Sequence, residues 1–335
     1  MKNIKNLLLF CSITLICLTG CKKEDSFDGN VIALIEDTVF KEYCIQFDTN
    51  GDGELSAAEA RAVDTIYVQR MNITSLTGIE YFTNLKVLDC SYNRISSLNI
   101  SKNTYLEELL CEYNNLTSLD ISKNTELTDL ICYENKISDL DISKNLKLQY
   151  FFCSDNQLTS LDMSKHTQII RLSCHNNQLT SIDVSKCTVM TDLACSENNI
   201  SALDVSKNLK LKYIYCSNNQ LSSLNLSNNT ELMELLCDNN NISTLDISKN
   251  ANLSRLYCSK NKLTVLDVSK NAWLSLLICS DNQLTSLDLS ESWNMSSINT
   301  CNNPNLYEIL VWFDTKYSPP IFFDIDDHTT FVTVP

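Results

Sequence analysis

Ten cysteines recur at a fixed interval of 21 residues, and this regularity restricts the fold of the chain more than any other feature. They are Cys90, Cys111, Cys132, Cys153, Cys174, Cys195, Cys216, Cys237, Cys258 and Cys279. A fixed period of about 20 to 50 residues is typical of solenoids, in which each repeat stacks on its neighbours. Because the interval never varies, the sequence predicts one continuous stack of rungs.

The repeat unit begins at Leu85 and reads L-x-x-L-x-C-x-x-N-x-[LI]-x-x-[LI]-[DN]-[ILVM]-S, with Cys at position 6 and Asn at position 9. All sixty core positions of the ten units in residues 85–294 hold Leu, Ile, Val, Met, Phe or Cys. Apolar and variable positions alternate in both halves of the unit, which indicates two short strands per repeat. We therefore expect two parallel sheets, about 4.8 Å between rungs and little helix.

This unit resembles the leucine-rich repeat, specifically the short 21-residue bacterial class called IRREKO, over about three-quarters of the chain. Residues 63–84 form a first repeat of 22 residues that looks like an internalin-type repeat, with Leu76, Ile79 and Phe82 facing inward. The resemblance implies a leucine-rich-repeat solenoid that is mainly β.

The last repeat is irregular. After Ile298 the period slips, because Thr300 stands where a cysteine is expected and Cys301 follows one residue late. We expect a last strand pair to begin with Leu306, Ile309 and Val311. The segments Pro319-Pro320 and Phe322-Phe323 should then close the stack as a C-terminal cap, since a solenoid must cover its terminal rung.

Asparagine occupies position 9 in every unit, from Asn93 to Asn282, and again at Asn303. We expect an asparagine ladder, meaning this column of side chains, to satisfy backbone groups of its own and the next rung. Aspartate at position 15 is mostly followed three residues later by lysine, which we interpret as turn capping with charge balance. A calcium-binding aspartate ladder is the alternative, but the Gly-rich turns of β-rolls are absent.

The cysteines at position 6, here called the cysteine ladder, are interpreted as small core hydrophobes. Disulfides between rungs are disfavoured because in-register side chains point the same way, and zinc binding because no C-x-x-C motif occurs. His166 and Cys187 replace asparagine at position 19 of adjacent rungs. A Cys–His catalytic pair would need an orienting group and an oxyanion hole, neither of which is visible, so the sequence predicts no enzyme.

The N-terminus resembles a bacterial lipoprotein signal. Lys2 and Lys5 precede an apolar run too short to span a membrane, and Leu18-Thr19-Gly20-Cys21 is similar to a lipobox. The resemblance implies cleavage before Cys21, on which diacylglycerol and an acyl chain such as palmitate would anchor the protein to a membrane. An ordinary secretory signal is the alternative. Residues 22–25, Lys-Lys-Glu-Asp, resemble the tethers that send lipoproteins to the outer-membrane surface.

A candidate calcium loop follows the tether. Residues 48–59 carry oxygen donors at loop positions 1, 3, 5, 9 and 12 and glycine at position 6. The loop resembles EF-hand and dockerin loops. That resemblance assigns Ca²⁺ to Asp48, Asn50, Asp52, the Glu54 carbonyl, Ser56 through water, and Glu59 as a bidentate ligand. A metal-free turn is the alternative. With a single loop, calcium would act as a structural brace of an EF-hand-like helical cap rather than as a sensor.

These signals divide the chain into five segments. They are a lipoprotein signal peptide in 1–20, a flexible tether in 21–29, the EF-hand-like cap in 30–62, the solenoid in 63–315 and the C-terminal cap in 316–335.

The outward position 5 of the first strand is apolar or aromatic in seven of ten rungs, which is unusual for a sheet that faces water, and position 3 adds Tyr150 and Tyr213. We predict a ligand-binding face that contains Tyr150, Phe152, Arg171, Tyr213, Tyr215, Leu236, Arg255 and Tyr257. Tyrosine and arginine are enriched at binding hot spots. The small Ser173 and Ala194 should leave a notch in this face between Phe152 and Tyr215. Packing between rungs is the alternative explanation of the apolar column.

The net charge of −15, or 24 − 41 = −17 once Lys2 and Lys5 are removed, disfavours a nucleic-acid partner. We expect a surface-exposed lipoprotein of the bacterial outer membrane that binds another protein in adhesion or a similar interaction. A glycan-binding accessory of nutrient uptake and a structural spacer of the cell envelope are the alternatives.

Overall fold

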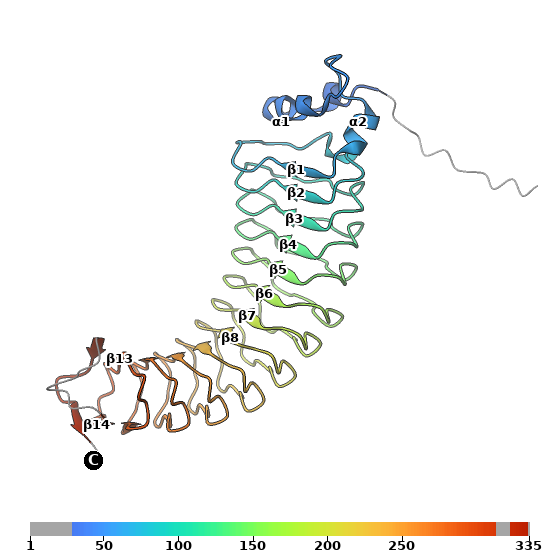
Figure 1. Ribbon diagram of the computed structural model, residues 1–335. Coiled ribbons are helices and arrows are strands. Elements are labelled where there is room, and N and C mark those ends of the chain that lie inside the picture. Colours follow the sequence, from blue (N-terminus) through green and yellow to red (C-terminus); the bar gives the residue numbers. More distant parts are fainter. Residues whose placement is uncertain (1–28, 313–321, 334–335) are drawn as a thin grey trace, which may run out of the picture.

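In the computed structural model, which describes residues 29–312 and 322–333, each regular repeat contributes a three-residue strand at positions 3 to 5. The strands stack in parallel into a solenoid with a helical cap at its N-terminal end (Figure 1). The axis of the stack is nearly straight through the first rungs and curves through the later ones (Figure 1). The predicted signal peptide, most of the tether with Cys21, and Pro319-Pro320 lie outside the described residues.

The long sheet has thirteen strands in the order β1 to β11, β13 and β15. Their bounds are β1 Thr65–Tyr67, β2 Val87–Asp89, β3 Glu108–Leu110, β4 Asp129–Ile131, β5 Tyr150–Phe152, β6 Arg171–Ser173, β7 Asp192–Ala194, β8 Tyr213–Tyr215, β9 Glu234–Leu236, β10 Arg255–Tyr257, β11 Leu276–Ile278, β13 Ser297–Asn299 and β15 Phe322–Asp324. A second sheet contains only β12 Leu287–Leu289, β14 Glu308–Val311 and β16 Thr330–Thr333.

The helical segments are short. They are η1 Val31–Leu34, α1 Thr38–Cys44, η2 Ile45–Phe47, α2 Ala57–Ala62 and η3 Ile79–Tyr81. No helix within the described residues is long and apolar enough to cross a membrane.

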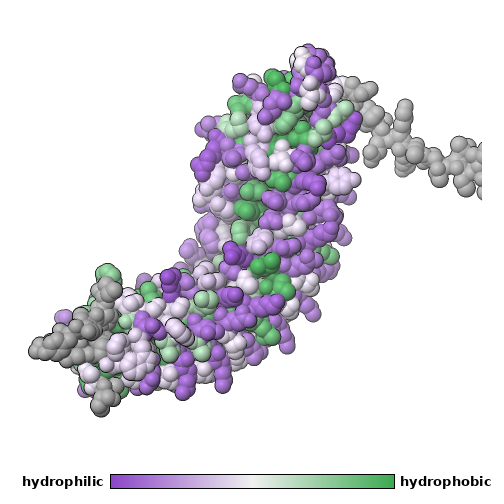
Figure 2. Space-filling model, viewed as in Figure 1, coloured by the Kyte–Doolittle hydropathy of each residue, from purple (hydrophilic) through white to green (hydrophobic). Residues whose placement is uncertain are grey.

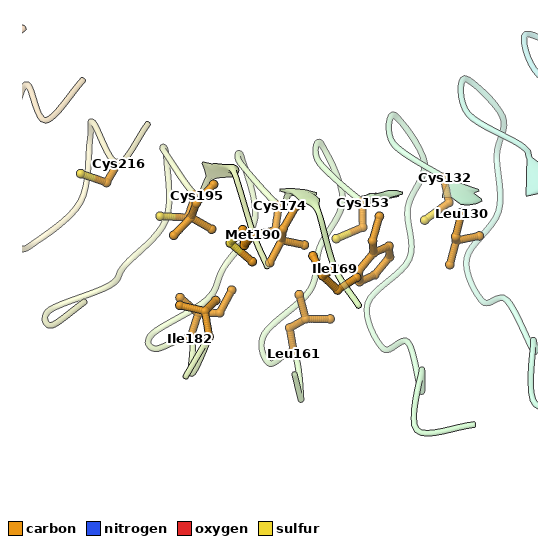
Figure 3. Packing of buried hydrophobic residues seen from close by; sticks show 14 of the residues in the cluster. Leu130, Cys132, Cys153, Leu161, Ile169, Cys174, Ile182, Met190, Cys195 and Cys216 are labelled. Carbon is orange, nitrogen blue, oxygen red and sulfur yellow. The ribbon is translucent and has the colours of Figure 1, made fainter. Parts of the chain in front are cut away.

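The register of the long sheet follows the sequence period. Leu172 pairs with Leu193, and Leu193 with Ile214, each 21 residues further along the chain. Position 4 is therefore an unbroken column inside the stack, and all six predicted core positions of every unit are buried. Figure 3 shows part of this core, with the cysteine ladder from Cys132 to Cys216. This confirms the predicted core and the mainly β leucine-rich-repeat fold.

The prediction of a second strand in every repeat is wrong, because the second half of the unit uses its backbone groups in local turns. In the rung of Asp204, the side-chain Oδ1 accepts the N–H of Ser206 at 2.8 Å, and the N–H of Asn208 donates to the Val205 carbonyl at 3.0 Å. These N–H groups are then not available to a neighbouring rung. The same contact confirms that aspartate at position 15 caps a turn.

The asparagine ladder forms, but it reaches back rather than forward. Asn198 donates from Nδ2 to the carbonyls of Cys174, Cys195 and Ser196 at 3.0 to 3.1 Å. Its Oδ1 accepts the N–H of Leu179, on the preceding rung, at 2.9 Å. In a pair of parallel strands, the N–H and C=O of one residue point to the same neighbouring strand. The backbone groups that a rung leaves unpaired therefore face the asparagine side chain of the next rung.

A second ladder, at position 19, where His166 and Cys187 replace asparagine in two rungs, is equally buried. Asn208 is fully buried and donates to the carbonyls of Val184 and Cys187 at 2.9 Å. Where His166 replaces this asparagine, its Nε2 lies 3.1 Å from the Ile142 carbonyl, so the imidazole replaces the amide in part.

The turn after each strand places position 8 in the left-handed region, with φ between 49° and 55° from Tyr92 to Asp281. Only some of these residues, such as Asn176 and Asn218, tolerate that region well. The stack imposes this conformation on Tyr92 and Tyr113 as well, because each turn must match those of its neighbours.

The N-terminal cap is joined to the first repeat by one carboxylate. Asp37 caps α1 through Oδ1, which accepts the N–H groups of Val39 and Phe40, while its Oδ2 accepts both the N–H and the hydroxyl of Thr74. Ile35 also packs directly on Gly78, where an added Cβ would lie 2.6 Å from Ile35 Cγ1. The cap therefore covers the first rung.

At the C-terminal end, the expected last strand pair is placed differently. Ile309 and Val311 do not begin a new rung; they pair with β12 through Leu287 and Leu289 and complete the second half of the rung that β13 begins. The offset of 22 residues between Leu287 and Ile309 reflects the slipped period. β15, which contains Phe322 and Phe323, then pairs with β13 and ends the long sheet. Both phenylalanine rings are exposed.

Candidate binding face and metal loop

The predicted binding face lies on the outward side of the long sheet. In β5 and β8, a buried residue at position 4 is flanked by half-buried aromatic rings at positions 3 and 5. Tyr213 and Tyr215 tilt against each other with their ring centroids 6.5 Å apart. Leu236 and Tyr257 continue position 5 in β9 and β10. Figure 2 shows apolar patches along the strand-bearing face between hydrophilic flanks.

Both arginines of the face pair with an acid on an adjacent strand. Arg171 Nε lies 3.6 Å from Asp192 Oδ2, and Arg255 Nη1 lies 3.6 Å from Glu234 Oε2. Burial, and then the carboxylates of Glu234 and Asp192, raise the pKa of Tyr215, so its hydroxyl is neutral at physiological pH. Such partly exposed ion pairs add little to stability.

The register places two small side chains where the sequence predicts a notch. Phe152 pairs with Ser173, Ser173 with Ala194, and Ala194 with Tyr215. The two aromatic rings are therefore three rungs apart, roughly 14 Å. The Ser173 hydroxyl is tied to Ser154 Oγ at 2.8 Å, which fixes one side of the space between the rings.

Two further surface features were missed by the sequence analysis. Arg70 lies 3.8 Å from the ring centre of Tyr92, which stacks on Tyr113 at 4.3 Å. The second feature is a groove at the edge where β8 to β10 begin, lined by Lys212, Glu231, Met233, Asn252, Ser254 and Trp273. Its residues come from three rungs, so no single repeat reveals it. Reading the columns at positions 21 and 2 would have found it.

The metal loop lies between η2 and α2. Gly51 and Gly53 have φ of 73° and 83°, and Leu55 is fully buried. Asp48 accepts the N–H groups of Gly51 and Gly53 through its two carboxylate oxygens at 2.7 and 2.8 Å. The Asn50 amide and the Asp52 carboxylate bond to each other at 2.8 Å.

Glu59 closes the loop. Its Oε1 accepts the N–H and hydroxyl of Thr49 at 2.8 Å, and its Oε2 accepts the N–H and hydroxyl of Ser56 at 2.9 and 2.8 Å. These bonds, from Ser56 first and then Thr49, lower the pKa of Glu59 to about 2, so the carboxylate is charged at neutral pH. Within the described residues, no three His, Cys, Asp or Glu side chains lie close enough together to hold a metal ion.

All cysteines of the described residues are free thiols. In the ladder, the sulfur atoms of successive rungs point the same way along the stack (Figure 3). Burial raises the pKa of Cys195 to about 12 and that of Cys174 well above its usual value, so these thiols stay neutral and unreactive.

The proposed reactive pair also lacks charge. Burial raises the pKa of Cys187 to about 12 and lowers the pKa of His166, so neither a thiolate nor an imidazolium forms at neutral pH.

No family model matches the chain. A search of curated proteins found no match either. Among solved structures, the chain is similar to the functional domain of InlJ from Listeria monocytogenes, which includes a cysteine ladder. The two are 31% identical with a TM-score of 0.82, and the match covers 90% of this chain and 71% of that one. The internalin inlF from Listeria monocytogenes is 19% identical over 91% of this chain and 99% of its own, with a TM-score of 0.71. The plant peptide hormone receptor RGFR1, in complex with RGF2, is 19% identical over 76% of this chain and 45% of its own, with a TM-score of 0.66.

Proposed function

Because the chain belongs to the family of bacterial leucine-rich-repeat proteins that includes the Listeria internalins, we propose that it binds another protein on the outward face of its long sheet. The single observation that carries this proposal is the set of half-buried aromatic rings at positions 3 and 5 of β5 and β8 and at position 5 of β10. Side chains of this kind, flanked by arginines, form the anchor of many protein interfaces.

Two other functions remain as alternatives. A glycan-binding accessory of nutrient uptake would use the same rings for stacking, and a structural spacer would need no ligand. We propose no enzymatic activity, and the neutral, buried state of Cys187 and His166 supports this.

A binding screen tests the proposal. The purified protein, probed against a library of extracellular proteins and against a glycan array, should bind a member of the protein library. Binding to glycans alone would favour the accessory function. Binding to neither set would favour the spacer.

We also propose that Cys21 carries the lipid that anchors the protein to the outer membrane, with the solenoid facing the cell surface. The lipobox-like sequence supports this. Cys21→Ser should release the protein from the membrane fraction or leave its signal peptide uncleaved, because the thioether to lipid needs the sulfur atom. Fractionation and the mass of the mature chain measure the outcome. Normal processing with unchanged membrane retention would show that no lipid is attached there.

For the metal loop, we propose a structural Ca²⁺ held by Asp48, Asn50, Asp52, the Glu54 carbonyl, Ser56 and Glu59. The oxygen-only donors and the positive φ of Gly53 suit a hard cation. The Glu59 carboxylate is already charged, although it would have to exchange its bonds with Thr49 for the cation. The bound ion would brace the cap against the first rung.

Ca²⁺ should therefore raise the melting temperature by several degrees, since a ligand at 100 times its Kd stabilises the native state by about 2.7 kcal/mol. Glu59→Ala should abolish this calcium-dependent gain. Glu54→Ala should retain it, because only the backbone carbonyl of Glu54 is a proposed ligand. Melting curves with chelator and with excess calcium give the measurement, and identical curves for the unmodified protein would identify the loop as an ordinary turn.

A further inference from the structure

The groove at the edge of the long sheet lies immediately before β8, β9 and β10. It has a volume of about 390 Å³. Lys212, Met233 and Ser254 occupy position 2, directly ahead of the three strands, and Trp273 stands at position 21 on one wall. Its base is rigid, because the N–H of Met233 donates to the Lys212 carbonyl at 2.9 Å and the N–H of Ser254 donates to the Met233 carbonyl at 2.8 Å.

Trp273 is the most unusual side chain of the groove, with 65% of its surface exposed. Its indole N–H has no hydrogen-bond partner within the part of the chain that the structure describes. Met233, 40% exposed, lies in the same groove. A tryptophan this exposed offers a flat apolar face and an unpaired N–H donor. Tryptophan is enriched at interfaces where one end of the side chain meets apolar groups and the other meets water.

The remaining lining is polar and supplies both donors and acceptors. Asn252 donates from Nδ2 to the Thr230 carbonyl at 3.1 Å, and Ser254 donates from Oγ to the Met233 carbonyl at 3.0 Å. These bonds fix the two side chains and leave the Asn252 Oδ1 and the Ser254 Oγ lone pairs as acceptors. Lys212 adds an ammonium donor, and Glu231 adds a carboxylate acceptor.

We propose that this groove binds neutral pyranose residues of a glycan, with one ring stacked on Trp273. A pyranose has an apolar face of C–H groups and a rim of hydroxyls that both donate and accept, which matches a flat indole beside mixed polar side chains. One lysine and one glutamate leave the lining without net charge, and the overall charge of −15 repels sulfated or uronic chains. The lining spans three rungs, about 10 Å, so it holds more than one ring.

This site is separate from the proposed protein-binding face. It shares no residue with that face, and it uses a different ligand class, so either proposal can fail alone. A protein anchor would fit the groove less well, because such anchors fill desolvated, well-packed pockets, whereas this groove is open to solvent and polar side chains form part of its lining.

Calorimetric titration of the purified protein with maltohexaose, cellohexaose, mannohexaose and xylohexaose tests the proposal. At least one of the four should bind, and Trp273→Ala should weaken that binding by about tenfold or more. Trp273→Tyr should retain most of it, because a flat ring remains. Trp293→Ala is the matched control: Trp293 is 56% exposed and lies against Trp312 instead of in the groove, so its loss should change nothing.

Three results would overturn the proposal: no binding of any of the four hexasaccharides, binding that Trp273→Ala leaves intact, or a Trp273 requirement for a protein ligand instead. Tyr215→Ala should leave hexasaccharide affinity unchanged. Should Trp273→Ala lower the melting temperature, Trp273→Leu decides instead, because it keeps an apolar side chain at this position without the flat ring and should lose hexasaccharide binding while Trp273→Tyr retains it.

Discussion

Replacing Asn198 with alanine should lower the free energy of unfolding by about 3 to 5 kcal/mol, as much as the loss of a large side chain from the core. The substitution removes three donated bonds and the acceptor for the Leu179 N–H. Asn198 is only 8% exposed, so water cannot take over these bonds in the folded chain. Each buried polar group left without a partner costs about 1 to 3 kcal/mol.

The neighbouring Asn199 provides the control. It is exposed, and its side chain accepts only one long contact, from Gln220 at 3.4 Å. Asn199→Ala should change stability by less than about 0.5 kcal/mol. Chemical unfolding should be followed by circular dichroism and by tryptophan fluorescence, because the tryptophans lie only between residues 273 and 312 and report the C-terminal end. Equal midpoints for Asn198→Ala and the unmodified protein would show that the ladder is dispensable.

Tyr215→Ala should weaken binding of a protein ligand by more than about tenfold while leaving the fold nearly as stable. Tyr215 is half-buried beside Ala194 and Leu236, and it forms one wall of the notch. Asp204→Ala should show the opposite pattern. It breaks the turn bond to the Ser206 N–H on the far side of the stack from the ligand, so it should lower the melting temperature slightly and leave affinity unchanged.

Affinity and melting temperature of both variants, measured with a ligand found in the protein screen, decide the matter. If Tyr215→Ala destabilises the fold and leaves affinity intact, the aromatic column is packing between rungs and the binding site lies elsewhere.

The register of the long sheet could be predicted from the sequence, because the 21-residue period leaves only one way to stack the strands with Leu at position 4 and Cys at position 6 facing inward. The same period places Ser173 and Ala194 on consecutive rungs of one column, whereas the notch itself stays a prediction. Long regular repeats make such inferences safe.

What could not be predicted depends on side-chain hydrogen bonds that compete with backbone pairing. The pattern around Leu203 and Val205 alternates as a strand would, but Asp204 turns the backbone back on itself. Asn208 is a polar residue in a turn, where side chains are usually exposed, and yet its side chain is fully buried. The left-handed φ of Tyr92 and Tyr113 has no signal in their residue type.

The hydrogen bonds between rungs run along the axis of the solenoid, and this has a mechanical consequence. A pull between the two ends loads the rungs in series, so every rung carries the same force and the bonds of the weakest rung open together while the others hold. Each rung that opens releases 21 residues, or about 70 Å of extended chain, while its neighbours keep their shape. A molecule built this way lengthens in equal steps under tension, and it absorbs work at every step instead of failing all at once.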